Sequence, residues 1–393
     1  MSVPAPHPPQ RVVIAGGGVA GLEGLLALRA LAGDRVDVVL VAPSDEFVVR
    51  ALDVVAPFDR SRASPPFDVE AICHEHGARF LRDAVHTVEG SHRSVLTRGG
   101  HALRYDALLL AVGARPRPAL DGVLTYRGAA DADVLAALVA DLQHERARRV
   151  VFAVPAGTTW PLPLYELALL VADAVAGHDV ELTLVTPESS ALGLFGGAAS
   201  THVGDLLAER GIALETDTYV REAGADGVAL GPARRTLAAD RVVALPRLEG
   251  PHLRGVPSDP DGFIVVDDLA RVPGLDGVFA VGDGATSLIK QGGAAAQQAG
   301  VAAAEIARGA GADVEIRPFR PVLRARLLTG AGAVNLRQEV AGGGDQASQA
   351  SDEILWWPPS KLAAPYLAPY LARRLDAREG RVLRDVEHRR SRR

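Results

Sequence analysis

Three glycines near the N-terminus have the spacing of a phosphate-binding turn. Gly16, Gly18 and Gly21 follow the apolar run 12–14 and precede a helix-forming segment over residues 22–31. In such a strand–turn–helix unit, the first glycine permits the tight turn and the second lets the backbone approach a pyrophosphate. The third lets the helix pack closely on the strand. The free N–H groups and the positive end of the helix dipole then face the phosphates, so the pattern predicts a dinucleotide site.

A second candidate group is acidic. Asp283 follows Gly282 at the end of the apolar segment 275–281. A carboxylate at the carboxyl edge of a strand can accept hydrogen bonds from sugar hydroxyls beside a pyrophosphate. The acidic residue that often follows the second strand of a dinucleotide fold is shifted or missing, because the run 36–41 continues into Ala42 and a proline, with Asp45 and Glu46 only later.

A third group is cationic and polar. Lys290, Gln291 and Gly292 lead into an alanine-rich helical segment that carries Gln297 and Gln298. A lysine and a helix N-terminus would both stabilise negative charge on a reduced cofactor. The two glutamines fit either a site or a polar helix face.

The composition sets limits on the function. The chain has 393 residues and a formal charge of −6, which argues against general nucleic-acid binding. No long apolar run and no secretion signal is present, so we expect a cytoplasmic location. Cys73 is the single cysteine, which excludes a redox cysteine pair, and the spacing of His74 and His76 does not predict a metal site. Only Lys290 and Lys361 are lysines among 42 basic residues.

A family resemblance rests on these motifs and on the buried strand 105–110, which ends in Ala111-Val112-Gly113. Together they resemble the two-dinucleotide-domain FAD/NAD(P) oxidoreductases of the pyridine nucleotide-disulfide type. The most similar members are single-subunit NADH:quinone reductases and sulfide:quinone reductases. The resemblance implies an α/β fold with two Rossmann-like (ββα-type, three-layer) domains, the second inserted in the first, plus a small C-terminal region.

The motifs place the boundaries along the chain. We expect the FAD-binding domain over 10–115 and 246–312 and the second nucleotide domain over 116–245. The C-terminal region, 313–393, would contain a flexible loop over 342–351, which lacks apolar anchors, and a basic tail.

The resemblance also assigns roles to residues. It implies catalytic roles for Lys290 and Gln298 and no metal site. The residues that it implies contact the cofactors are Gly16, Gly18, Gly21, Ala111, Gly113, Glu166, Gly282, Asp283, Gln291 and Gly292.

The first turn of the second domain departs from the family pattern. Pro155, Pro161 and Pro163 remove backbone donors there, and Trp160 and Leu164 would crowd a pyrophosphate. Glu188, after the second strand of this domain, could meet a ribose hydroxyl or be a solvated acid. NAD(P)H binding at this turn therefore stays open.

Three functions compete. The first is an FAD-dependent enzyme that passes a hydride or electron pair from NAD(P)H through flavin N5 to a quinone-like acceptor. The second is a sulfide:quinone reductase-like enzyme with another donor and no catalytic cysteine pair. The third is a flavin-binding protein without turnover. The partners would be small-molecule donors and acceptors and no nucleic acid, with a homodimer and peripheral contact of the C-terminal region with the inner face of a membrane as open alternatives.

Overall fold

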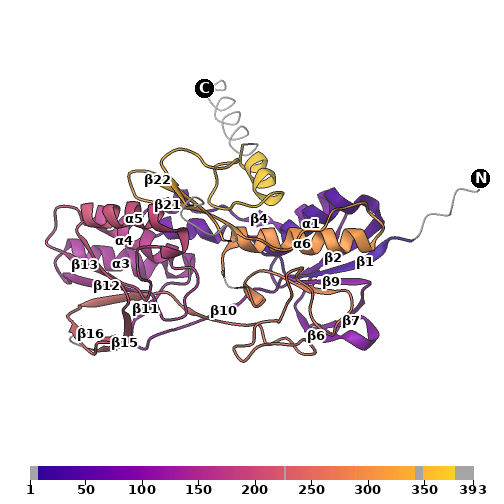
Figure 1. Cartoon of the computed structure of the whole chain (residues 1–393), viewed down its shortest axis with the longest axis horizontal. Helices are drawn as coiled ribbons and strands as arrows, with labels where there is room; N and C mark the ends of the chain where they lie inside the picture. The colour runs from indigo at the N-terminus through magenta and orange to yellow at the C-terminus, as the bar shows by residue number, and fades with distance from the viewer. Residues whose placement is uncertain (1–7, 225–226, 288, 341–347, 377–393) are drawn as a thin grey trace, which may run out of the picture.

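The computed structural model describes residues 8–224, 227–287, 289–340 and 348–376. Their main feature is a pair of five-stranded parallel sheets, each with helices on one face, that lie side by side (Figure 1). This arrangement confirms the predicted α/β, Rossmann-like fold class.

The first sheet has the strand order β20-β9-β1-β2-β5. Its strands are β1 (Gln10–Ala15), β2 (Val36–Ala42), β5 (Arg79–Arg82), β9 (Ala107–Leu110) and β20 (Val278–Ala280). The central strands are continuous apolar runs because both faces of a parallel sheet are covered. The sheet draws its strands from both sides of the segment that builds the second sheet.

Helices cover one face of the first sheet, namely α1 (Val19–Ala32), α2 (Val69–Glu75) and α6 (Gly292–Gly309). Helices α1 and α6 lie side by side along the sheet (Figure 1). Gly24 lets α1 pack closely on the sheet, since a Cβ there would lie 2.5 Å from Leu109 Cδ2 on β9 and 4.0 Å from Ala299 Cβ on α6. The other face is covered by the antiparallel strands β6 (Val85–Glu89), β7 (Ser94–Thr97) and β8 (Ala102–Arg104) and by the segment around Val256 and Val272.

The second sheet repeats the architecture in the order β11-β18-β12-β13-β14. Its strands are β11 (Leu124–Thr125), β12 (Arg149–Ala153), β13 (Glu181–Val185), β14 (Ile212–Glu215) and β18 (Arg241–Ala244). Its helices are α3 (Ala132–Gln143), α4 (Leu162–Ala174) and α5 (Gly197–Glu209). Its far face is covered by β15 (Tyr219–Gly224), β16 (Gly227–Gly231) and β17 (Thr236–Leu237).

Two stretches of chain cross between the halves. They pair as the short antiparallel strands β10 (Arg115–Arg117) and β19 (Arg247–Glu249). These crossovers lie close to the domain limits expected from the sequence, which themselves stay a prediction.

The C-terminal region bridges the two halves (Figure 1). Its sheet consists of β21 (Val322–Leu328), β22 (Ala333–Glu339) and β23 (Gln349–Ser351), and the inner face of β21 and β22 packs in the core of the second half. Residues 362–371 pack instead against the core of the first half. This double attachment closes the space between the halves from one side.

Part of the expected flexible loop is ordered. Residues 342–347 of that prediction lie outside the described residues, but Gln349–Ser351 forms β23 against β22. Ser348 is buried, and its Oγ donates to Phe195 O at 2.5 Å. A polar segment can form a strand when the edge of a neighbouring strand supplies its backbone hydrogen bonds. The sequence pattern did not indicate this pairing. The expected basic tail at 377–393 also lies outside the described residues.

Candidate active site

The turn between β1 and α1 has the shape of a phosphate-binding turn. Gly16 adopts a φ of +122°, and a Cβ there would lie 2.1 Å from Ala111 O. A Cβ on Gly21 would lie 1.8 Å from Gly16 O, so only glycine allows the helix to start this close to the strand. A Cβ on Gly18 would meet no atom within 4 Å, and no side chain caps α1 at this residue. The first amides of α1 are therefore available to an anion.

Two strand ends meet beside this turn. Ala111 and Gly113 follow β9, and Gly282 and Asp283 follow β20 in the neighbouring position of the sheet. They approach so closely that a Cβ on Gly284 would lie 2.8 Å from Gly113 O. The structure thus brings the three separate glycine and aspartate motifs to one edge of the first sheet, where ligands bind in open α/β folds.

Asp283 has the character of a ligand-binding carboxylate. No hydrogen bond or ion pair to its side chain occurs among the described residues. Burial raises its pKa, and the positive charges of Lys290 and Arg50 act in the opposite direction. A buried carboxylate without a donor is unfavourable, and the hydroxyl groups of a ribityl chain would supply donors.

Gln298 lies behind this turn. It is buried on α6, and its Oε1 accepts a hydrogen bond from Gly282 N at 2.8 Å. Gln297 joins α6 to β21, because its Nε2 donates to Val322 O at 2.9 Å and its Oε1 accepts from Val322 N at 2.9 Å. Neither glutamine lines the cavity described below. The catalytic role of Gln298 stays a prediction, and the contact it makes is one that positions Asp283.

The N-terminus of α6 points into the space between the halves. Gln291 caps the helix, since its Oε1 accepts from Ala294 N at 2.7 Å, while its Nε2 donates to Arg324 O at 3.1 Å. Gly292 and Gly293, the first residues of the capped helix, line the cavity. This geometry favours negative charge at the helix end.

Lys290 precedes this helix. Its Nζ donates to Ala285 O and lies 4.0 Å from the centroid of the Phe263 ring. Burial lowers its pKa to about 8, against the opposing effects of Asp283 and Asp259. The ammonium has no ion-pair partner among the described residues, so it can act on a cofactor or substrate.

Glu166 and Lys361 form a buried ion pair on the opposite wall. Glu166 lies in α4 and Lys361 in the C-terminal region; their side chains are 1% and 4% exposed. Glu166 Oε1 accepts from Lys361 Nζ and from Leu328 N, the latter at 2.9 Å. Burial raises the pKa of Glu166 and lowers that of Lys361, and their mutual attraction opposes both shifts. The two pKa values are drawn toward each other, so the pair can hold or release a proton.

These groups share one cavity of about 450 Å³ between the halves. Five of the residues that were predicted to be catalytic or to contact a cofactor line it, namely Glu166, Asp283, Lys290, Gln291 and Gly292. Both lysines of the chain are among the lining residues. The glycines after β1 and the residues Ala111 and Gly113 lie at the strand ends beside it.

The turn after β12 forms another wall of this cavity. Helix α4 begins after Pro161 and has Pro163 in its first turn, which leaves few free amides. Trp160 packs edge-on against Phe195 with centroids 5.7 Å apart. Thr159 Oγ1 accepts from Lys290 N at 3.3 Å, so this turn lies next to the lysine.

Glu188 is engaged inside the second half. Its Oε2 accepts from Tyr165 Oη at 2.9 Å and from Thr186 Oγ1 at 3.0 Å, and burial raises its pKa. Both of these internal donors bind the same carboxylate oxygen. The contact of Glu188 with a ribose stays a prediction.

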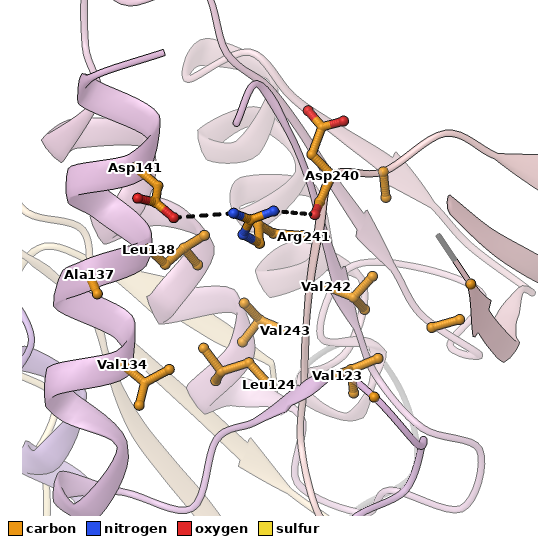
Figure 2. A pocket seen from close by; sticks show the side chains of 14 residues that line it. Val123, Leu124, Val134, Ala137, Leu138, Asp141, Asp240, Arg241, Val242 and Val243 are labelled. Atoms are coloured by element: carbon orange, nitrogen blue, oxygen red, sulfur yellow. Dashed lines mark hydrogen bonds and ion pairs between the residues drawn. The ribbon is translucent and has the colours of Figure 1, made fainter. Parts of the chain in front are cut away.

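A second hollow of about 620 Å³ lies at the outer edge of the second sheet. Figure 2 shows its apolar walls, from β11, α3 and β18, and the ion pair between Asp141 and Arg241 at 3.2 Å. None of the residues singled out in the sequence lines it. We therefore assign the chemistry to the cavity between the halves.

Sequence reasoning missed two groups in the cavity. Lys361 was noted only for the rarity of lysine, and Arg326 on β21 carried no signal. Both reach the cavity because the C-terminal region folds back over the site. A third buried group, Glu23 on α1, accepts from Tyr366 N at 3.0 Å and from Leu367 N at 2.7 Å and so anchors the helical residues 367–376.

Comparison with known proteins agrees with this geometry. The sequence profile of the family described as pyridine nucleotide-disulphide oxidoreductase matches residues 10–303. The chain belongs to this family. It is an FAD-dependent oxidoreductase.

Individual relatives span most of the chain. An NADH dehydrogenase-like protein of Mycobacterium tuberculosis is 29% identical over 299 residues, which covers 70% of this chain and 72% of that protein. The sulfide:quinone oxidoreductase of Aquifex aeolicus superimposes with a TM-score of 0.77 and 21% identity, over 87% of this chain and 86% of the other. A ferredoxin reductase of Rhodopseudomonas palustris has a TM-score of 0.64 and 21% identity, over 85% and 84% of the two chains. The structural likenesses support the shared fold.

Proposed function

We propose that this oxidoreductase transfers a hydride from NAD(P)H, through flavin N5, to a quinone-like acceptor. The observation that carries the proposal is the cavity between the halves, where Asp283, Lys290 and the Glu166–Lys361 pair line one space. The likeness to an NADH dehydrogenase-like protein supports the choice of donor. When bound, FAD takes up the hydride and passes the electron pair on.

The residues of the first half would hold the cofactor. The amides after Gly18 would bind the pyrophosphate, and Asp283 would accept hydrogen bonds from the ribityl hydroxyls. Lys290 and the N-terminus of α6 would place positive charge beside the flavin ring. That charge favours the reduced, anionic form of the ring and raises its tendency to accept a hydride.

Glu166 and Lys361 would manage protons on the acceptor side. A quinone-like acceptor takes up protons together with electrons, and Glu166 lies in the cavity wall with a raised pKa. Lys361 holds the carboxyl group in place and shares its proton. The pair, which is itself buried, would therefore supply a proton to the acceptor.

The sulfide-type alternative lacks a chemical group. In the sulfide:quinone reductases that the sequence resembles, sulfur extraction uses paired cysteines, whereas this chain has one cysteine. Cys73 is buried on α2, and burial raises the pKa of its thiol to about 12, so little thiolate forms. We therefore rank NAD(P)H as the donor ahead of sulfide.

Contact with a membrane, a homodimer and a cytoplasmic location stay predictions. Among residues 8–376, the described ones include no helix that is both long and apolar enough to cross a bilayer. Trp357, which is 83% exposed, and Ile354, which is 56% exposed, support peripheral contact of the C-terminal region.

A steady-state assay tests the proposal. The purified, FAD-loaded protein should oxidise NADH or NADPH only when a quinone is supplied, and Glu166→Gln should slow this turnover. Flavin content identical to that of the wild type would be the control for the variant. If FAD remains bound but no quinone supports NADH or NADPH oxidation, the protein is either a non-catalytic flavin binder or an enzyme with another donor.

A further inference from the structure

Arg326 is one of the cations of the cavity wall. It lies on β21, and its Nη1 donates to Pro359 O at 2.5 Å, which fixes the orientation of the guanidinium. Its Nε is buried and has no hydrogen-bond partner. No carboxylate forms an ion pair with it among the described residues.

The neighbouring side chains are committed elsewhere. Glu166 accepts from Lys361 and from the backbone of Leu328. Asn335, the cross-strand partner of Arg326, donates to Ser351 O at 3.4 Å and to Glu353 O at 2.9 Å. The guanidinium of Arg326 thus has no carboxylate partner among the described residues, and it can pair with an anion that enters the cavity.

The local charge balance points the same way. The positive charge of Arg326 lowers the pKa of Lys361, so the two cations lie close enough to repel each other. Among the described residues, the one carboxylate that forms an ion pair with either of them is Glu166, which pairs with Lys361. A desolvated cation without a counter-charge is costly, and an incoming anion removes that cost.

We propose that Arg326 binds a carboxylate of the electron acceptor, so that the acceptor is an aromatic or quinonoid acid rather than a neutral quinone. The inference rests on the proposed function and names its substrate class. The planar guanidinium matches the geometry of a carboxylate. Leu162, Leu362 and Ala325 supply apolar cavity walls for the ring of such an acid.

Calorimetric titration of the oxidised, FAD-loaded protein tests the subsite without turnover. The probes are naphthoate and its neutral isostere naphthamide. Wild-type protein should bind naphthoate more tightly, and Arg326→Gln should weaken naphthoate binding by about 10- to 100-fold, as expected for a charge-assisted hydrogen bond. Naphthamide binding should change by less than about 3-fold.

A matched control lies on the same strand. Arg324→Gln makes the same charge change two residues away, at a side chain that does not line the cavity, and it should leave naphthoate binding intact. Arg326→Lys keeps the charge and lacks the Nε donor edge, so it should restore part of the affinity. Thermal unfolding of each variant shows whether it is folded.

Several results would overturn the subsite. Equal binding of both probes by the wild type, or an equal loss in Arg324→Gln, would exclude an anion site at Arg326. Loss of FAD from Arg326→Gln would assign the guanidinium to the flavin instead. Because no donor is present in the titration, failure of NADH to reduce the protein would contradict the proposed function and leave this result unaffected.

Discussion

Replacing Lys361 with methionine should destabilise the protein in a pH-dependent way. The substitution keeps an unbranched apolar side chain but leaves Glu166, which is 1% exposed, with Leu328 N as its remaining donor. Removal of one partner of a buried ion pair costs about 3–5 kcal/mol, because the other charge is left uncompensated. We expect a loss of this size in the free energy of unfolding near neutral pH.

The sign of the pH dependence follows from the pKa of Glu166. Burial raises that pKa in the folded protein, and loss of Lys361 removes the attraction that opposes the shift. A carboxyl group with a raised folded pKa stabilises the folded state fully below its unfolded pKa and loses this contribution as pH rises through the folded pKa. The Lys361→Met variant should therefore be closest to the wild type near pH 5 and furthest below it near pH 8.

Urea unfolding, followed by circular dichroism at both pH values, measures the effect. The double variant Glu166→Gln/Lys361→Met removes both charges and should recover much of the lost stability. A single variant whose loss is independent of pH would refute the reasoning. So would a double variant that is less stable than the single variant at the higher pH.

Three other predictions concern the flavin turn, the proton pair and the C-terminal helix. Gly18→Leu should abolish FAD binding and leave the fold intact, because a Cβ at residue 18 meets no atom within 4 Å, whereas Gly21→Val should lower the melting temperature, because a Cβ at residue 21 would lie 1.8 Å from Gly16 O. Measurements of FAD content and melting temperature distinguish the two variants. A Gly18→Leu protein that is still yellow would contradict the assignment. Glu166→Gln should leave reduction of the flavin by NADH unchanged and slow electron transfer to the acceptor by about 100-fold, at the lower end of the range for loss of a general acid. Stopped-flow measurement of the two half-reactions separately checks this prediction, and slowing confined to the NADH step would refute it. Burial raises the pKa of Glu23 to about 7, so the contribution of this group to stability is present below its ordinary pKa and is lost as pH rises toward 7. Glu23→Gln should therefore flatten the dependence of the free energy of unfolding on pH in that window. If the slope of this dependence is unchanged in the variant, Glu23 does not titrate there.

The sequence was sufficient for those parts of the fold whose signals are local. The apolar run before Gly16, the glycine spacing and the strand end at Asp283 each reside in a few consecutive residues, and the structure places them at one sheet edge. Parallel sheets require continuous apolar strands and short glycine turns, so these features are legible without long-range information.

Features that depend on distant contacts were not predictable in this way. Lys361 meets Glu166 across 195 positions of sequence, and β23 forms because β22 offers an edge to a polar segment. Arg326 is one of 40 arginines, the remainder of 42 basic residues after two lysines, and only the cavity distinguishes it. Which charges become buried together is decided by packing, which a local pattern does not encode.

The assignment of an NAD(P)H-oxidising flavoenzyme is tested most directly by anaerobic titration of the purified, FAD-loaded protein with NADH and NADPH. The flavin absorbance at about 450 nm reports the oxidation state of the cofactor. We expect that one of the coenzymes bleaches this band at stoichiometric concentration and that added quinone restores it. A flavin band that neither coenzyme bleaches would contradict the account and would move the search to a different donor.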